Sequence, residues 1–309
     1  MTIKTALPLL ALIAATPALA QDDCNSVTFA DVGWTDITAT TAATSVVLDA
    51  LGYETDTKLL SVPVTYISLA EGDVDVFLGN WMPTMEADIA PYREAGTVDT
   101  VRANLEGAKY TLAVNKAAAD MGIATFADIA ANRDALGDEI YGIEPGNDGN
   151  RLILDMIAAN AFDLEGFKVV ESSEQGMLAQ VERADGRDAP IVFLGWEPHP
   201  MNAKFDMTYL EGGDDWFGPN LGGATVYTNT RAGYVAACPN VGKLLENLSF
   251  TLPMENEIMG AILNDNADPQ EAAKAWLAAN PDAWSGWLDG VTTLDGGDAK
   301  AAVNAALNG

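Results

Sequence analysis

Three short stretches of the chain combine Gly with Trp, and aromatic faces are good partners for a positive charge. In each stretch an apolar run with strand character reaches a Gly and then a Trp. Because the face of an indole ring carries negative charge density, several such faces together attract an organic cation. Trp34, Trp81 and Trp196 are therefore candidate ligand walls, and the alternative is that they fill a core. The stretches are residues 31–34 (DVGW), 77–83 (FLGNWMP) and 193–198 (FLGWEP).

Two polar features lie next to these tryptophans. Asp36 follows Trp34 by two residues. It can therefore face the same ligand cleft as Trp34, or it can serve as a helix N-cap. The loop 144–150 (EPGNDGN) precedes an expected helix. Its backbone amides and Asn side chains can bind a ligand oxygen, and the alternative is that they form ordinary turn and capping contacts. Quaternary ammonium groups gain most from aromatic walls. Sugars also stack on Trp, but they need more polar side chains than these stretches offer.

Catalysis finds little support in the residue pattern. The single histidine, His199, stands between Pro198 and Pro200, and we find no Ser nucleophile motif, metal-ligand cluster or phosphate loop. We therefore expect no enzyme, no catalytic residue, no metal and no cofactor. A paired-carboxylate hydrolase stays as an alternative, because acidic residues are abundant.

The first half of the chain alternates strands and helices, which is typical of an α/β fold. We expect strands at 26–32, 53–60 and 74–78, a helix ending at Gly52 with Thr38 as its cap, and a helix starting at Pro63. Ligands of open α/β sheets sit outside the carboxyl ends of the strands. Each Trp of the three motifs is expected just past such an end.

The alternation restarts after about residue 110, which predicts a second lobe. We expect lobe I to comprise residues 21–109 and 228–309, and lobe II residues 110–227. Chain crossings are expected near 107–112 and 224–230, with the C-terminal helices completing lobe I. Trp276, Trp284 and Trp287 have the spacing of core residues in a packed helix pair.

The charge balance limits the partners. Asp and Glu total 45 against 16 Lys and Arg in 309 residues, for a formal charge of −29. Nucleic acids and anionic membrane surfaces are poor partners for such a protein. A cationic ligand is attracted, although the acidity also has a plain explanation in solubility.

The N-terminus predicts export. Lys4 precedes an apolar run that ends at Ala18-Leu19-Ala20, so we expect a signal peptide cleaved after Ala20. The two cysteines, Cys24 and Cys238, suggest one disulfide in an exported protein. A lipid anchor on Cys24 is the alternative, but the acidic residues before it do not suit one.

Taken together, these motifs resemble the periplasmic choline-binding proteins of ABC importers, within the wider glycine-betaine and proline-betaine binding family. The resemblance covers the whole mature chain. It is carried by residues 33–36 (GWTD), 79–83 (GNWMP), 110–112 (YTL), 142–147 (GIEPGN) and 195–198 (GWEP).

This resemblance implies a type II periplasmic-binding fold with two hinge crossings and a ligand in the cleft between the lobes. It implies a monomer that delivers choline to a membrane permease, and it supports the Cys24–Cys238 disulfide. Glycine betaine is the alternative ligand: its carboxylate is repelled by Asp36, but Arg151 near a helix N-terminus is able to accept it. The implied site residues are a cage of Trp34, Trp81, Tyr110 and Trp196, with Asp36 and Asn147 bonded to the choline hydroxyl.

Overall fold

The computed structural model describes residues 24–309, and the expected signal peptide lies outside these residues. The strands are β1 (Ser26–Asp31), β2 (Glu54–Leu59), β3 (Val76–Met82), β4 (Val98–Asn115), β5 (Glu139–Tyr141), β6 (Lys168–Val170), β7 (Val192–Glu197), β8 (Met207–Tyr209) and β9 (Gly223–Arg231).

The helices that precede β9 cover residues 35–222. They are α1 (Thr35–Ala50), α2 (Val62–Glu71), α3 (Glu86–Ala95), α4 (Lys116–Asp120), α5 (Phe126–Ala131), α6 (Arg133–Leu136), α7 (Asp148–Ala158), η1 (Ala161–Asp163), α8 (Glu174–Asp185), α9 (Met201–Lys204), α10 (Asp214–Phe217) and α11 (Pro219–Gly222).

The chain after β9 is helical. Its helices are α12 (Tyr234–Ala237), α13 (Pro239–Asn247), α14 (Leu252–Asn264), α15 (Pro269–Ala279), α16 (Pro281–Ser285), η2 (Gly286–Leu288) and α17 (Ala299–Asn308).

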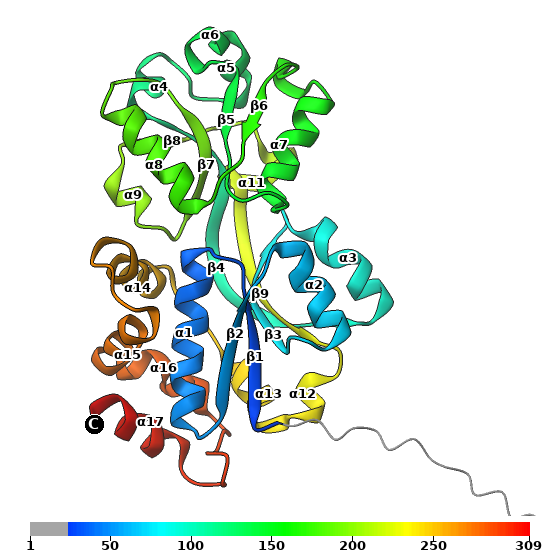
Figure 1. The fold of residues 1–309 in the computed structure, drawn as a ribbon, viewed down its shortest axis with the longest axis vertical. Coiled ribbons are helices and arrows are strands. Elements are labelled where there is room, and N and C mark those ends of the chain that lie inside the picture. The colour runs from blue at the N-terminus through cyan, green and yellow to red at the C-terminus, as the bar shows by residue number, and fades with distance from the viewer. Residues whose placement is uncertain (1–23) are drawn as a thin grey trace, which may run out of the picture.

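The elements form two groups that β4 and β9 join (Figure 1). We call β1–β3 with α1–α3 and α12–α17 the lower group, and β5–β8 with α4–α9 and α11 the upper group. The long strand β4 covers the crossing expected near residues 107–112. The C-terminal helices α14–α17 lie beside α1 in the lower group, as the sequence pattern predicts.

The same strand order occurs in both groups. In the lower group it is β2-β1-β3-β9-β4, and in the upper group it is β6-β5-β7-β4 with β8 on the far side of β4. In the lower group β1 pairs in parallel with β2 and β3, and in the upper group β5 pairs in parallel with β6 and β7. The third strand, β3 or β7, then pairs antiparallel with a joining strand. The two near-identical sequence motifs therefore occupy equivalent strands, and each is followed by a cis X-Pro bond, Met82-Pro83 and Glu197-Pro198.

Helix α1 is buried on nearly every side because it packs between the sheet and the C-terminal helices α14 and α15. Its Ala and Thr residues keep the helix narrow enough for this position. A buried hydroxyl needs a partner, and the helix backbone supplies one for two of them: Thr40 Oγ1 donates to the Asp36 carbonyl at 3.0 Å, and Thr44 Oγ1 to the Thr40 carbonyl at 2.8 Å. The hydroxyls of Thr41 and Ser45 in the same helix have no partner among the described residues.

The structure differs from the sequence predictions in three places. Helix α1 begins at Thr35 with Trp34 as N-cap, so Thr38 is not the cap and Asp36 lies inside the helix. Trp81 and Trp196 belong to the last residues of β3 and β7 and do not follow them. Helices α3 and α17 were not expected, because the first is interrupted by a proline and the second is short and rich in Ala.

A disulfide joins Cys24 to Cys238, as predicted. It ties Cys24, two residues before β1, to Cys238, the N-cap of α13, across a sequence separation of 214 residues. The start of β1 and helices α12 and α13 lie in the lower group, at the end away from the upper group (Figure 1). Among the C-terminal tryptophans, Trp284 and Trp287 are buried in the core, whereas Trp276 is only partly buried against it.

Replacing both cysteines with Ser is expected to lower the free energy of unfolding by about 2–5 kcal/mol, because a cross-link over a long loop restricts the unfolded chain. Guanidinium titration of the double variant, followed by far-UV circular dichroism, measures this loss. Wild-type protein unfolded in a reducing agent is the control and should match the variant. Equal midpoints for the oxidised wild type and the variant would contradict the expectation.

Candidate ligand-binding site

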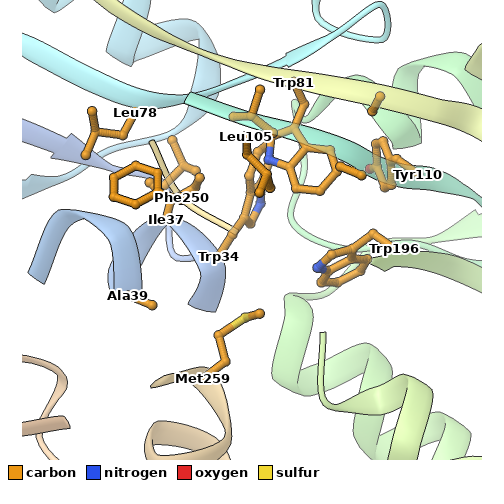
Figure 2. Close-up of a cluster of buried hydrophobic side chains, with 14 of the residues drawn as sticks. Trp34, Ile37, Ala39, Leu78, Trp81, Leu105, Tyr110, Trp196, Phe250 and Met259 are labelled. Carbon is orange, nitrogen blue, oxygen red and sulfur yellow. The ribbon is translucent and has the colours of Figure 1, made fainter. Parts of the chain in front are cut away.

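A small cavity lies where the two groups meet. The empty space between its side chains is small, about 260 Å³. Its lining residues are only 1–6% exposed, so the site is closed to solvent. Five of the six predicted site residues take part. The lining consists of Trp34, Asp36, Trp81, Tyr110, Ile143 and Trp196, and the four aromatic rings face a common space in Figure 2.

Glycine shapes each of the three Trp motifs, in two different ways. Gly33 has φ +82°, a conformation that favours glycine, and its N–H donates to Asp31 Oδ1 at 2.7 Å; this turn delivers Trp34 to the cavity. Gly79 lies inside strand β3, where an added Cβ would lie 2.7 Å from the Ile37 side chain. Gly195 in β7 is similarly crowded, by the side chain of Met207 in β8. The latter two glycines therefore permit close packing beside the tryptophans.

Tyr110 connects the aromatic walls. It pairs with Trp196 across β4 and β7, and its ring meets those of Trp196 and Trp81 edge-on at centroid distances of 6.2 and 6.1 Å. Phe217, which the sequence did not single out, supports the same ring at 6.0 Å. Such edge-to-face contacts fix the orientation of each ring.

Asp36 is the charged group of the cavity. Its Oδ2 accepts a hydrogen bond from Trp81 Nε1 at 3.1 Å, whereas its Oδ1 is buried with no partner among the described residues. Burial raises the pKa of Asp36 to about 8, and the negative charge of Glu174 adds to the rise. The helix-cap alternative is wrong for Asp36. A positive group in the cavity would offset the cost of ionising this buried acid.

Asn147 lies behind the cavity and does not line it. It is the N-cap of α7, where its Oδ1 accepts from the Asn150 N–H at 2.9 Å. The Tyr110 hydroxyl lies 3.5 Å from the same oxygen. The capping function that the sequence suggested is therefore present, and Tyr110 contacts both Asn147 and the Trp rings.

Further carboxyl groups surround the cavity. Glu144 Oε1 accepts from Trp34 Nε1 at 2.8 Å, and burial raises the pKa of Glu144 to about 7. Burial also raises the pKa of Asp148 to about 6. Burial and the nearby Asp36 charge raise the pKa of Glu255, on α14, well above its usual range. The field in the cavity therefore favours a cation.

Glu174 and His199 form a buried polar contact beside the cavity that the sequence pattern did not predict. Glu174 begins α8 and accepts hydrogen bonds from Thr35 and His199. Both residues follow upper-group strands, so a search of every strand end could have marked them. Only the fold, however, shows that they meet Thr35 of the lower group.

The guanidinium of Arg151 is held by other groups. Arg151, which the sequence marked as an acceptor for a ligand carboxylate, donates to Asp88 Oδ2 at 2.6 Å and to the Thr84 carbonyl at 3.2 Å. It does not line the cavity. Among residues 24–309 there is no group of three or more His, Cys, Asp or Glu side chains that could hold a metal ion. The arrangement is therefore suited to an organic cation.

Replacing Gly149 with Ala tests whether the cavity depends on tight packing at α7. An added Cβ there would lie 2.0 Å from the Tyr110 hydroxyl, so Tyr110 must move. We expect a loss of about 1–3 kcal/mol in the free energy of unfolding, together with a changed near-ultraviolet circular dichroism spectrum. Gly260→Ala in α14 is the control, since its nearest neighbour is 3.9 Å away. Equal behaviour of the two variants would contradict the packing at Tyr110.

Comparisons with known proteins agree with this geometry. A solved ABC-transporter choline binding protein in complex with choline is 69% identical, with a TM-score of 0.91, over 92% of this chain and 99% of that chain. An ABC-transporter choline binding protein in an unliganded semi-closed conformation is also 69% identical, with a TM-score of 0.86 over 93% and 100% of the two chains. The chain thus has the fold of periplasmic substrate-binding proteins, and it matches the complex more closely than the semi-closed form.

A curated relative extends the comparison. The glycine betaine/carnitine transport binding protein GbuC of Listeria monocytogenes serotype 1/2a (strain 10403S) is 32% identical over 181 residues, which cover 57% of this chain and 58% of that protein. No helix among residues 24–309 is long and apolar enough to cross a membrane. The family model for the substrate binding domain of the ABC-type glycine betaine transport system (OpuAC) matches residues 25–279, and the chain belongs to this family.

Proposed function

We propose that this protein captures choline in the cavity and delivers it to the membrane permease of an ABC importer. Its family is one of transport proteins that bind a solute and are not enzymes, so the hydrolase alternative is set aside. The 69% identical protein that was solved in complex with choline supports the choice of ligand. The proposed ligand residues are the predicted ones: Trp34, Asp36, Trp81, Tyr110, Asn147 and Trp196.

The observation that carries this proposal is the unpartnered oxygen of Asp36 inside an aromatic cavity. Choline has a trimethylammonium group for the rings and a hydroxyl that can donate to Asp36 Oδ1. Each ring contact with a cation contributes about 0.5–2 kcal/mol. Four rings and a charge-assisted hydrogen bond together reach the roughly 8 kcal/mol that micromolar binding requires. Asn147 lies one contact further out, behind Tyr110, so its part in binding would need a shift of that ring or a bridging water.

Glycine betaine fits this cavity less well. Its carboxylate would lie near Asp36, and Arg151 is occupied by Asp88 and Thr84. The backbone N–H of Asn150 at the start of α7 is also taken, by the Asn147 side chain. A sugar fits less well again, because Asp36 is the one charged residue among those lining the cavity and the others are aromatic or aliphatic.

We also propose that the two groups of elements move as two lobes. The expected boundaries, residues 21–109 with 228–309 and residues 110–227, fall within or beside the joining strands β4 and β9. The burial of the cavity supports a closed state, and a ligand can enter only if the lobes separate. A monomer is sufficient for this motion.

The cellular compartment of the protein follows from its family. Substrate-binding proteins of ABC importers act in the periplasm, and we propose that residues 1–20 direct export and are cleaved after Ala20. The Cys24–Cys238 disulfide is compatible with that oxidising compartment.

Calorimetric titration of the wild type with choline, glycine betaine and a panel of sugars tests the ligand assignment. We expect choline to bind most tightly. Asp36→Asn should weaken choline binding by about 10–100-fold, because a hydrogen bond to a charged group is lost. Asp155→Asn, on the exposed face of α7, makes the same charge change away from the cavity and should bind normally. Tighter binding of glycine betaine than of choline would overturn the ligand assignment, and binding of a sugar would overturn the proposal of an aromatic cage for a cation.

The raised pKa of Asp36 predicts that pH controls closure of the empty protein. In the closed form Asp36 keeps its proton up to about pH 8, whereas in an open, hydrated form it releases the proton near its ordinary value of 3.8. Because the closed form binds more protons in this window, raising the pH from 4 to 8 should favour the open form. Glu144, with its pKa of about 7, acts in the same direction.

Small-angle X-ray scattering of the ligand-free protein measures this effect. The radius of gyration should rise with pH, less steeply in Asp36→Asn, and choline should restore the smaller value at pH 8. A radius that falls with rising pH in the ligand-free wild type would contradict the assignment.

A further inference from the structure

We infer that Glu174 is a positioning residue that holds the site closed by capping helix α1 from the opposite lobe. The inference rests on the proposed function, since it concerns how the ligand is retained. Glu174 lies outside the cavity lining and does not touch the proposed ligand.

Helix α1 lacks a cap of its own. Its N-cap residue is Trp34, which provides no side-chain hydrogen bond to the first turn. The first backbone N–H groups of a helix need partners from elsewhere, and a negative charge is favourable there. Glu174 supplies both: its Oε2 accepts the Thr35 N–H at 2.8 Å, and its Oε1 accepts the Thr35 hydroxyl.

A third donor reaches Glu174 from its own lobe. His199 Nδ1 accepts the Met201 N–H at 2.9 Å, so the proton of a neutral His199 ring lies on Nε2. That Nε2–H donates to Glu174 Oε1 at 3.2 Å. Glu174 and His199 are both buried, and the buried carboxylate is stabilised by three donors. Two of these donors belong to Thr35 and are present only while the lobes are together.

These contacts link opposite walls of the cavity. Thr35 lies between Trp34 and Asp36 in the sequence, so fixing its backbone fixes the turn that carries both. His199 packs against Trp196 with ring centroids 5.0 Å apart. Glu174 therefore connects the Trp34 wall to the Trp196 wall. Its negative charge also acts on Asp36 and strengthens the field that favours a cation.

Two substitutions separate this role from a general effect on folding. Glu174→Gln keeps the shape but replaces one acceptor oxygen with an amide donor. Thr35→Val removes only the hydroxyl, which is exposed to water whenever the lobes separate. Glu182→Gln is the matched control, because Glu182 lies on the same helix and bonds Lys204 at the surface.

The first readout is the rate of ligand dissociation, measured by stopped flow with choline. Glycine betaine replaces choline if the wild type binds glycine betaine instead. We expect the dissociation rate to rise about tenfold in each variant, with the association rate nearly unchanged. The double variant should dissociate no faster than Glu174→Gln alone, because both changes break one contact. Thr35→Val should leave the melting temperature of the ligand-free protein unchanged. Wild-type dissociation rates in both variants would overturn the inference, as would a lowered melting temperature of Thr35→Val without faster dissociation.

The radius of gyration of the ligand-free proteins provides a readout that needs no ligand. Glu174→Gln and Thr35→Val should both be more open than the wild type and Glu182→Gln. If the wild type binds neither choline nor betaine while this difference is seen, the proposed function fails and the role of Glu174 stands. If it binds neither and all four proteins have the same radius, the inference fails as well.

Discussion

A buried carboxylate without a complete set of partners is the constraint on which the site depends. Asp36 has one oxygen bonded to Trp81 and the other unpaired, in a cavity with otherwise apolar walls. An isolated charge in such surroundings is costly, so the group either keeps a proton or acquires a positive neighbour. The faces of the aromatic rings attract a cation. If the two groups close around a ligand as proposed, closure is less favourable without a cation than with one.

The repeated strand order explains how one small set of motifs can build both sides of the site. Strands β3 and β7 occupy the same position in their groups and carry Trp81 and Trp196. The repeat is not symmetric in chemistry, however. On β9, the residue paired with Trp81 is Val226, whereas on β4 the residue paired with Trp196 is Tyr110. The joining strand β4 therefore supplies a fourth ring, and the second joining strand supplies none.

Much of this could be predicted from the sequence, for identifiable reasons. The alternation of strands and helices predicts the α/β fold, and glycine and tryptophan at the strand ends predict the family and five of the six lining residues, all except Ile143. The start of α1 could not, because Thr35–Thr41 resembles a polar loop and is helical only where tertiary packing buries it. That Asn147 caps α7 and is not part of the cavity lining could not be predicted either, since a loop pattern does not reveal which side chain faces the cavity. Glu174 escaped notice because its partner is 139 residues away.

The division of the cage between two lobes has a consequence for selectivity among cations. Trp34, Trp81 and Asp36 belong to the lower group, and Trp196 to the upper, so an entering ion loses its hydration shell in two stages. A trimethylammonium group is weakly hydrated, and the methyl surface it presents is matched by indole faces at each stage. A sodium or potassium ion is drawn by the same negative field, but the rings cannot replace the water it must shed. The acidic surroundings can thus concentrate cations of every kind near the cleft, while the dry aromatic walls admit only those that part with water easily.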